Sequence, residues 1–282
     1  MPINIENLTF KYESSAGVAQ HAIENVTLTI NDNETLCIIG HTGSGKSTLV
    51  QHINGLLQPT GGSIEINGIN LNNKQKRYEI RKNVGMVFQY PEYQLFEETV
   101  EKDIAFGPKN LGVAQDDILD HVKKAMDIVK LDYDKYAKRS PFELSGGEKR
   151  RVALAGVLAT DPATVILDEP MAGLDPIGKS QMIKLILELK QSKTIIMISH
   201  NMDDVAMLAD RVAVLNKGSL LLIGTPLEVF SQDELLQSIN LDIPTAAGFA
   251  KKLRDNNINV PKDIITFEQL VDFLGERLCL TV

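Results

Sequence analysis

The stretch Thr35-Leu36-Cys37-Ile38-Ile39 is apolar throughout and leads directly into Gly40-His41-Thr42-Gly43-Ser44-Gly45-Lys46-Ser47-Thr48. A continuous apolar run of this length is typical of a central strand in a parallel sheet, where helices cover both faces. The glycine-rich stretch has the spacing of a phosphate loop: glycine, four residues, then glycine, lysine and serine. The sequence therefore predicts a strand, a loop and a helix that together cradle a nucleotide triphosphate.

The residue types of this phosphate loop, residues 40–48, suit phosphate binding. Glycines let backbone amides approach phosphate oxygens without a Cβ clash, and a helix starting near Lys46 adds the positive end of its dipole. The charge of Lys46 would neutralise β- and γ-phosphate oxygens, and the hydroxyl of Ser47 would ligate Mg²⁺. We therefore expect ATP as the ligand of the whole loop, with Mg²⁺ beside it.

Two further apolar runs, residues 164–167 and 194–198, predict neighbouring parallel strands. Ligand sites in open α/β sheets lie at the carboxyl ends of strands, so Asp168, Glu169 and His200 are expected beside the loop. There, Asp168 would hold Mg²⁺ largely through water, Glu169 would polarise the attacking water, and His200 would contact the γ-phosphate. Alone, Asp-Glu also fits a strand-end turn and His200 a core histidine, but the preceding phosphate loop favours the functional interpretation.

Shorter patterns predict the flanking elements. Period-2 alternation at residues 3–5 and 26–30 indicates half-buried antiparallel strands, and residues 212–215 and 220–223 indicate a closing hairpin. The middle of the chain is expected to be helical, with Asp116 as the cap of one helix. The apolar face of that helix is expected to carry Ile118, Leu119, Val122, Ala125, Met126 and Val129.

The chain of 282 residues is expected to divide into a nucleotide-binding domain, residues 1–230, and a small C-terminal domain, residues 231–282. The first would contain a helical subdomain at about residues 92–160. The second would contain amphipathic helices at about 245–256 and 266–274, and it is expected to add dimer contacts.

Composition excludes several classes. The formal charge of −8 argues against a nucleic-acid partner, and the basic cluster at residues 74–82 is interpreted as a solvated helix surface. No apolar run is long enough to span a bilayer, and the first residues lack the features of a secretory signal. Cys37 and Cys279 are expected to be reduced core thiols, as in a cytosolic protein.

A second glycine-rich stretch is Leu144-Ser145-Gly146-Gly147-Glu148, here called the signature loop. We expect a helix to begin at Gly146, so Ser145 and the amides of both glycines would offer hydrogen-bond donors and a helix dipole to phosphate. From the residues alone, a glycine-rich helix start without a ligand also fits.

The two loops, Gln89, the stretch Ala172-Gly173-Leu174-Asp175 and His200 stand in the order found in ATP-binding cassette (ABC) ATPases. Residues 1–230 resemble that family. The resemblance implies an α/β fold, the P-loop NTPase type with a mixed central sheet, an antiparallel β subdomain and an α-helical subdomain, followed here by a small α-helical C-terminal appendage. It also implies that each ATP is held between the phosphate loop of one subunit and the signature loop of the other.

The same resemblance assigns further roles. Ser145, Gly146 and Gly147 would serve the partner's nucleotide. Tyr12 matches the aromatic residue that stacks on adenine, although Phe10 stands close by and a packing role for Tyr12 also fits. Gln89 matches the residue that senses Mg²⁺ and relays the nucleotide state to a membrane partner. The acid at the dimer interface corresponds to Asp175, while Glu148 and Met171 depart from the common Gln and Thr or Ser without changing the backbone chemistry.

A finer similarity lies in residues 88–100 and 103–108, which resemble the ATPases of energy-coupling factor importers of vitamins and transition-metal ions. Residues 40–43 and 97–99 are more similar to the second of the two ATPase types in those complexes. The resemblance implies an ATP-hydrolysing peripheral subunit at the cytoplasmic face of the cell membrane. Its partners would be a paralogous ATPase subunit, a membrane-embedded coupling subunit and a substrate-binding membrane subunit.

Other interpretations remain at this point. The chain could be the ATPase of another cassette importer, or a soluble cassette protein acting on ribosomes or DNA. Soluble members of those kinds carry two cassettes or long coiled coils, and this chain has neither. Four acidic residues suggest a contact with basic side chains of a membrane partner, while an ordinary solvated helix start also fits: Glu92, Glu97, Glu98 and Glu101.

Overall fold

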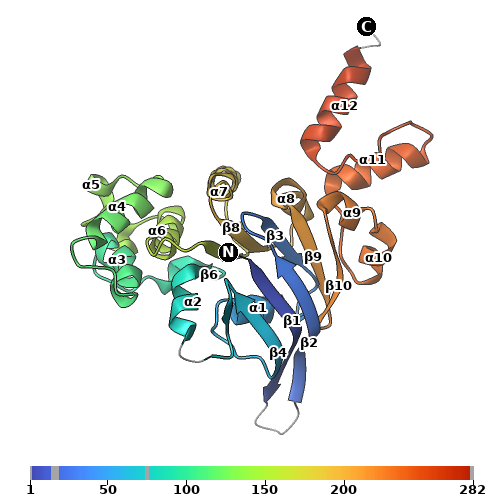
Figure 1. Ribbon diagram of the computed structural model, residues 1–282. Coiled ribbons are helices and arrows are strands. Elements are labelled where there is room, and N and C mark those ends of the chain that lie inside the picture. The colour runs from blue at the N-terminus through green and yellow to red at the C-terminus, as the bar shows by residue number, and fades with distance from the viewer. Residues whose placement is uncertain (1, 14–18, 74–75, 280–282) are drawn as a thin grey trace.

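A six-stranded sheet forms the centre of the computed structural model, which describes residues 2–13, 19–73 and 76–279 (Figure 1). The strand order is β10-β9-β3-β8-β7-β6, with β10 antiparallel to β9 and all other neighbours parallel. The strands are β3 (Thr35–Ile39), β6 (Val84–Val87), β7 (Thr164–Asp168), β8 (Thr194–Ile198), β9 (Arg211–Asn216) and β10 (Ser219–Gly224). Every residue of β3 and β8 is buried, so the predicted central strands and the closing hairpin are confirmed.

A second, antiparallel sheet has the order β2-β1-β4-β5. Its strands are β1 (Ile3–Glu13), β2 (Ala19–Ile30), β4 (Gly61–Ile66) and β5 (Ile69–Asn70). The first two strands run well beyond the predicted segments. The reason is a set of register shifts between them, accompanied by left-handed backbone at Asn7 (φ 49°) and Asn25 (φ 52°), which interrupt the alternation that a sequence pattern detects.

The two faces of the six-stranded sheet bury separate cores. Leu36 and Ile38 of β3 face the antiparallel sheet and helix α1 (Lys46–Ile53), whereas Cys37 and Ile39 face the helical side. This alternation follows from the pleat of the strand. Because both faces are covered, the carboxyl ends of the parallel strands are fixed rigidly beside the start of α1.

In Figure 1, helices α2 to α6 lie on the left of the large sheet, α7 and α8 at the top, and α9 to α12 on the right. They are α2 (Arg77–Asn83), η2 (Pro91–Gln94), α3 (Val100–Asn110), α4 (Ile118–Ile128), α5 (Tyr133–Tyr136), η3 (Pro141–Glu143), α6 (Gly146–Leu158), α7 (Pro176–Leu189), α8 (Met202–Leu208), α9 (Pro226–Phe230), α10 (Asp233–Ser238), α11 (Thr245–Asp255) and α12 (Phe267–Cys279). In the described part of the chain, no helix combines the length and apolarity needed to cross a bilayer.

Helix α4 differs from its prediction in two details. Its N-cap is Asp117, not Asp116, and the side chain of Asp117 makes no capping hydrogen bond. Leu119, predicted on the apolar face, is 42% exposed. The cause is the helical period: Leu119 lies about 100° around the axis from Ile118, outside the stripe that Ile118 shares with Val122.

The C-terminal segment has a small core of its own, formed by Ala246, Ala250, Val260, Ile264 and Leu270. Leu236 and Leu241, which precede it, pack into the main helical-side core. Helix α12 extends away from the rest of the molecule in Figure 1. The division at residue 230 stays a prediction.

The two cysteines and the basic cluster were also predicted. Cys37 is a buried free thiol, and burial raises its pKa above the usual range, as expected for an inert core thiol. The side chain of Cys279 lies outside the described residues, as do Lys74 and the side chain of Arg77. Lys76 and Lys82 are exposed, which fits a solvated surface.

Candidate nucleotide site

The phosphate loop wraps around the side chain of Lys46. Its Nζ donates to the carbonyl oxygens of Gly40 at 2.7 Å and His41 at 3.1 Å. Burial lowers the pKa of Lys46, and the nearby Glu169 and Asp168 carboxylates oppose that shift. The ammonium is thus held centrally in the loop, within a buried environment where a phosphate charge would be strongly attracted.

Two glycines of this loop are required by close approach. A Cβ at Gly40 would lie 2.3 Å from the carbonyl oxygen of Leu215, and one at Gly45, where φ is 102°, would lie 2.5 Å from that of Ala22. At Gly43 a Cβ would meet nothing within 4 Å. Helix α1 begins after Gly45 without a side-chain cap, so its first amides are available to an anion.

The acids lie at the end of β7. The Ser47 hydroxyl donates to Oδ2 of Asp168 at 3.3 Å. Burial raises the pKa of Asp168, while the Ser47 hydrogen bond and Lys46 oppose that rise. Gln89 lines the same cavity. Oxygen atoms of these residue types are the donors that Mg²⁺ prefers.

Glu169 has left-handed backbone, with φ of 52°, and its N–H donates to the carbonyl of Ile198 at 3.1 Å. This turn directs a carboxylate that is only 16% exposed toward His200, whose Nε2 lies 3.3 Å from Oε1. Oε1 is buried and makes no hydrogen bond. Burial raises the pKa of Glu169 to about 7, and burial also lowers the pKa of His200. Near neutral pH the carboxylate can therefore accept a proton readily.

These groups surround one cavity of about 480 Å³. Its lining consists of Tyr12, His21, Ala22, Thr42, Gly43, Gly45, Lys46, Ser47, Thr48, Gln89, Asp168, Glu169, Ile198 and His200. Three predicted loop residues, Gly40, His41 and Ser44, do not line it. The ring of His41 instead contacts the carbonyl of Thr42 at 2.7 Å and Asn216 at 3.1 Å, so it fixes the loop from behind.

The aromatic residue at the mouth of the cavity is Tyr12. Its hydroxyl lies 3.3 Å from Oγ1 of Thr48, and its ring makes a T-shaped contact with that of Phe10, with 4.8 Å between the centroids. Phe10 in turn packs against the ring of His52. Because Tyr12 is 44% exposed, part of its ring stays available for stacking on a base.

The signature loop lies elsewhere. Ser145, Gly146 and Gly147 do not line this cavity, and a Cβ at either glycine would meet nothing within 4 Å. Helix α6 begins at Gly146, as predicted, and Ser145 and Glu148 form a capping box. The signature loop therefore does not contribute to the cavity that the phosphate loop of the same chain lines.

Sequence reasoning missed a buried junction centred on Arg150 of α6. Its guanidinium contacts both carboxylate oxygens of Glu92 at 3.2 and 3.3 Å and donates to the carbonyl of Ala172 at 2.7 Å. Arg150 lies in α6, Glu92 in the segment after Gln89 and Ala172 in the segment after Glu169. No local pattern marks such a pair, because arginine and glutamate are usually solvated. His21 and Ala22 were also missed, although pairing β2 with β1 would have placed them near Tyr12.

Comparisons with known proteins agree with the geometry. The sequence matches the family described as ABC transporter over residues 23–172. The energy-coupling factor transporter ATP-binding protein EcfA2 of Clostridium tetani is 52% identical over 272 residues, 95% of this chain and 94% of that protein. The protein of the same name from Clostridium perfringens is 50% identical over 279 residues, 98% of each.

Two solved structures are similar as well. The structure of cbiO1 from Clostridium perfringens, part of the ABC transporter complex cbiONQ, has a TM-score of 0.72 and 36% identity, and the match covers 84% of this chain and 94% of that one. A dimeric post-hydrolysis state of the ATP-binding cassette MJ0796 bound to ADP and Pi has a TM-score of 0.70 and 25% identity, covering 79% and 98%. The predicted fold class is confirmed. The chain is therefore an ATP-binding ATPase of the ABC transporter family and belongs to the energy-coupling factor transporter ATP-binding proteins of the second ATPase type.

Proposed function

We propose that this chain is the ATP-hydrolysing subunit of an energy-coupling factor importer and powers the uptake of vitamins or transition-metal ions through membrane partners. The observation that carries the proposal is the convergence of Lys46, Ser47, Asp168, Glu169 and His200 on one cavity, together with Gln89. The names of the relatives support the transport role.

Each side chain has a task that its surroundings allow. Lys46 neutralises phosphate charge, and His200, which lines the same cavity, contacts the γ-phosphate. The carboxylate of Glu169 accepts the proton of the attacking water, because its raised pKa makes it a better base than an ordinary glutamate. Mg²⁺, held by Ser47, Gln89 and Asp168, would supply charge that stabilises the phosphoryl group during transfer.

The ATP site is completed by a second ATPase subunit. Ser145 and the amides of Gly146 and Gly147 are offered outward, to the nucleotide of a partner that is a paralogue of this chain, and Asp175 lies at the same interface. The dimeric relative bound to ADP and Pi supports this arrangement. Exposed apolar residues of α12, such as Phe267 (53%) and Val271 (64%), would add contacts between the C-terminal domains.

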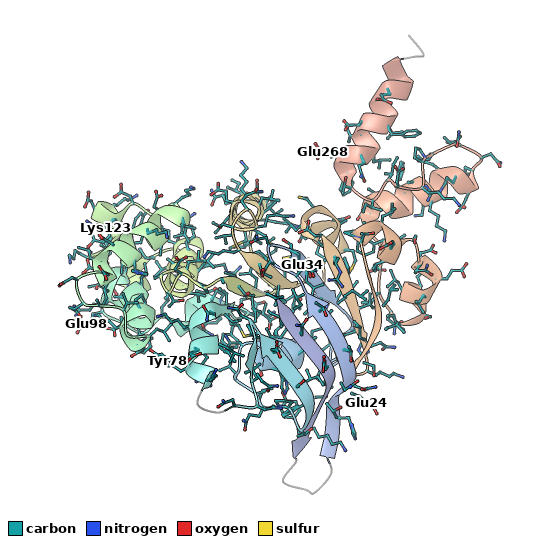
Figure 2. All side chains as sticks on the ribbon, in the orientation of Figure 1. Glu24, Glu34, Tyr78, Glu98, Lys123 and Glu268 are labelled. Atoms are coloured by element: carbon teal, nitrogen blue, oxygen red, sulfur yellow. The ribbon has the colours of Figure 1, made fainter. Side chains whose placement is uncertain are left out.

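The segment after Gln89 presents a surface to the membrane partner. Tyr93 is 84% and Phe96 57% exposed, and Glu98 points outward at the edge of the helical side (Figure 2). Asp103 accepts hydrogen bonds from the backbone amides of Phe96 and Glu97 at 3.0 and 2.9 Å, so this surface is preorganised. It would dock a basic helix of the coupling subunit and hold the chain peripherally at the cytoplasmic face.

In the structure, fewer acidic side chains are available to a membrane partner than the sequence suggested. The side chain of Glu92 is only 17% exposed and pairs with Arg150. Glu101 accepts a hydrogen bond from Tyr133 and pairs with Lys138 at 3.0 Å. Glu98 pairs with Lys102 at 2.6 Å, but its side chain is 82% exposed, so Glu97 and Glu98 are the acids proposed to meet a partner.

Isolation from membranes through an affinity tag on this chain tests the proposal. We expect a second ATPase subunit, a coupling subunit and a substrate-binding membrane subunit to accompany it, and the complex to hydrolyse ATP. Ribosomes or DNA in their place would contradict the transport role. A different set of membrane subunits would instead indicate another cassette importer.

The docking surface has its own test. The double charge reversal Glu97→Lys with Glu98→Lys should reduce recovery of the coupling subunit, because like charges would then meet at the interface. The matched control reverses two exposed strand acids, Glu24 and Glu65, and should leave assembly unchanged. Equal recovery from both double variants would contradict docking at this surface.

A further inference from the structure

The carboxylate of Glu148 uses the serine of the signature loop as a hydrogen-bond donor. Its Oε2 accepts from the amide of Ser145 at 2.8 Å and from the hydroxyl of Ser145 at 2.7 Å. Its Oε1 accepts from the hydroxyl of Tyr136 at 2.8 Å. These hydrogen bonds lower the pKa of Glu148 to about 2, so the group is a carboxylate at any physiological pH.

These hydrogen bonds disfavour the binding of an anion at Ser145. A serine hydroxyl has one proton to donate, and in Ser145 that proton is directed at Glu148, while the oxygen accepts from the amide of Glu148 at 3.4 Å. A phosphate that approaches the loop must compete with a charged acceptor for this proton. It also meets a full negative charge one hydrogen bond away from the binding serine.

We propose that Glu148 weakens the ATP site that the signature loop of this chain completes, relative to the same loop with a neutral glutamine. The inference rests on the proposed function, since it assumes that the loop contacts the partner's nucleotide. In a pair with a paralogue whose loop lacks this charge, the two ATP sites differ in affinity. Glu148 thereby makes the two ATP sites of the ATPase dimer unequal, although it does not line the nucleotide cavity of its own chain.

The substitution Glu148→Gln isolates the charge. Glutamine has the same shape, its carbonyl can accept both Ser145 hydrogen bonds, and its amide can donate to the oxygen of Tyr136. The capping box and the tie to α5 are therefore preserved while the charge is removed. Only the competition for the serine proton and the repulsion of phosphate change.

The chain contains a matched control. Thr225 and Glu228 form a second capping box at the start of α9, in which Oε2 of Glu228 accepts from the Thr225 amide at 2.7 Å and hydroxyl at 3.0 Å. Neither residue lines the nucleotide cavity. Glu228→Gln thus makes the same change in a helix cap that contacts no nucleotide.

The test is the ATP dependence of hydrolysis by the isolated membrane complex. Glu148→Gln should lower the KM for ATP by about threefold or more, with kcat changed less than KM. Glu228→Gln should leave KM unchanged. A KM that is unchanged or raised in Glu148→Gln, or lowered equally in both variants, overturns the inference.

A third variant separates this inference from the proposed function. Lys46→Ala should strongly impair ATP binding and hydrolysis if the chain is the proposed ATPase. If Lys46→Ala is impaired but Glu148→Gln has the KM of the wild type, only the role of Glu148 is wrong. If Lys46→Ala retains the affinity and rate of the wild type, the proposed function itself is contradicted.

Discussion

The hydroxyl of Ser47 donates to Oδ2 of Asp168 at 3.3 Å, although 121 positions separate the two residues in the chain. The contact joins the phosphate loop to the end of β7, at the edge of the sheet where the parallel strands end. When Mg²⁺ is bound, Ser47 would ligate it directly and Asp168 would hold it largely through water. Substitutions at these two positions therefore test metal binding separately from phosphate binding.

Asp168→Asn should weaken ATP binding mainly in the presence of Mg²⁺. Removing a carboxylate that holds the ion through water should reduce metal affinity by about 10- to 100-fold, as for other residues that act on a metal indirectly. The measurement is equilibrium binding of a fluorescent ATP analogue with Mg²⁺ and with a chelator. Ser47→Ala should show the same dependence, whereas equal losses with and without Mg²⁺ would exclude Asp168 as a metal ligand.

The stability of the nucleotide-free chain should depend on pH through Glu169. Burial raises the pKa of this carboxyl from 4.5 to about 7. Its contribution to stability is therefore complete below about pH 4.5 and is lost as the pH rises through about 7, where a buried charge forms. Glu169→Gln cannot ionise, so it should raise Tm more at pH 8 than at pH 5.5.

The control for this pH dependence is Glu228→Gln. Hydrogen bonds from the Thr225 amide and hydroxyl lower the pKa of Glu228, so its carboxylate stabilises the fold above the usual glutamate pKa. Its replacement should lower Tm at both pH values. A Tm gain for Glu169→Gln that is the same at pH 5.5 and pH 8 would show that the carboxyl is not shifted.

The ion pair between Arg150 and Glu92 should be required for stability. Its side chains are only 5% and 17% exposed, so Arg150→Met would leave a carboxylate buried without its partner. Loss of one member of such a pair costs about 3–5 kcal/mol, and replacing Glu92 by Met as well should recover much of that loss. Chemical denaturation measures the free energy of unfolding of both variants.

An exposed ion pair serves as the control for the buried one. Lys124 and Asp161 lie 3.7 Å apart with side chains 69% and 54% exposed. Lys124→Met should change the free energy of unfolding by less than about 1 kcal/mol, because solvent screens exposed pairs. If Arg150→Met were equally mild, the junction would have no structural role.

The sequence predicted those parts of the fold that local physics determines. Burial on both faces produced the unbroken apolar runs of β3 and β8, and phosphate chemistry constrained the residues around Lys46 so closely that their spacing alone located the loop. The ends of β1 and β2 were missed because bulges at Asn7 and Asn25 break the period that the prediction used.

The remaining errors concern contacts between distant segments. Glu92 has the sequence context of a solvated acid, yet it pairs with Arg150, 58 positions away. Likewise, the partial burial that raises the pKa of Glu169 depends on how β7, β8 and α1 meet, and no local pattern encodes that arrangement. The sequence therefore predicted which groups line the cavity as candidate catalytic residues, while the structure supplied their electrostatics.

The most direct test of the central claim is single-turnover hydrolysis of ATP by the isolated complex carrying Glu169→Gln. Loss of the general base should slow hydrolysis by about 10²-fold or more while ATP affinity is retained, and the closed two-subunit state should accumulate with ATP bound. Hydrolysis at the rate of the wild type, with no accumulation of the closed state, would contradict the assignment of Glu169 and with it the account of this cavity as the site of ATP hydrolysis.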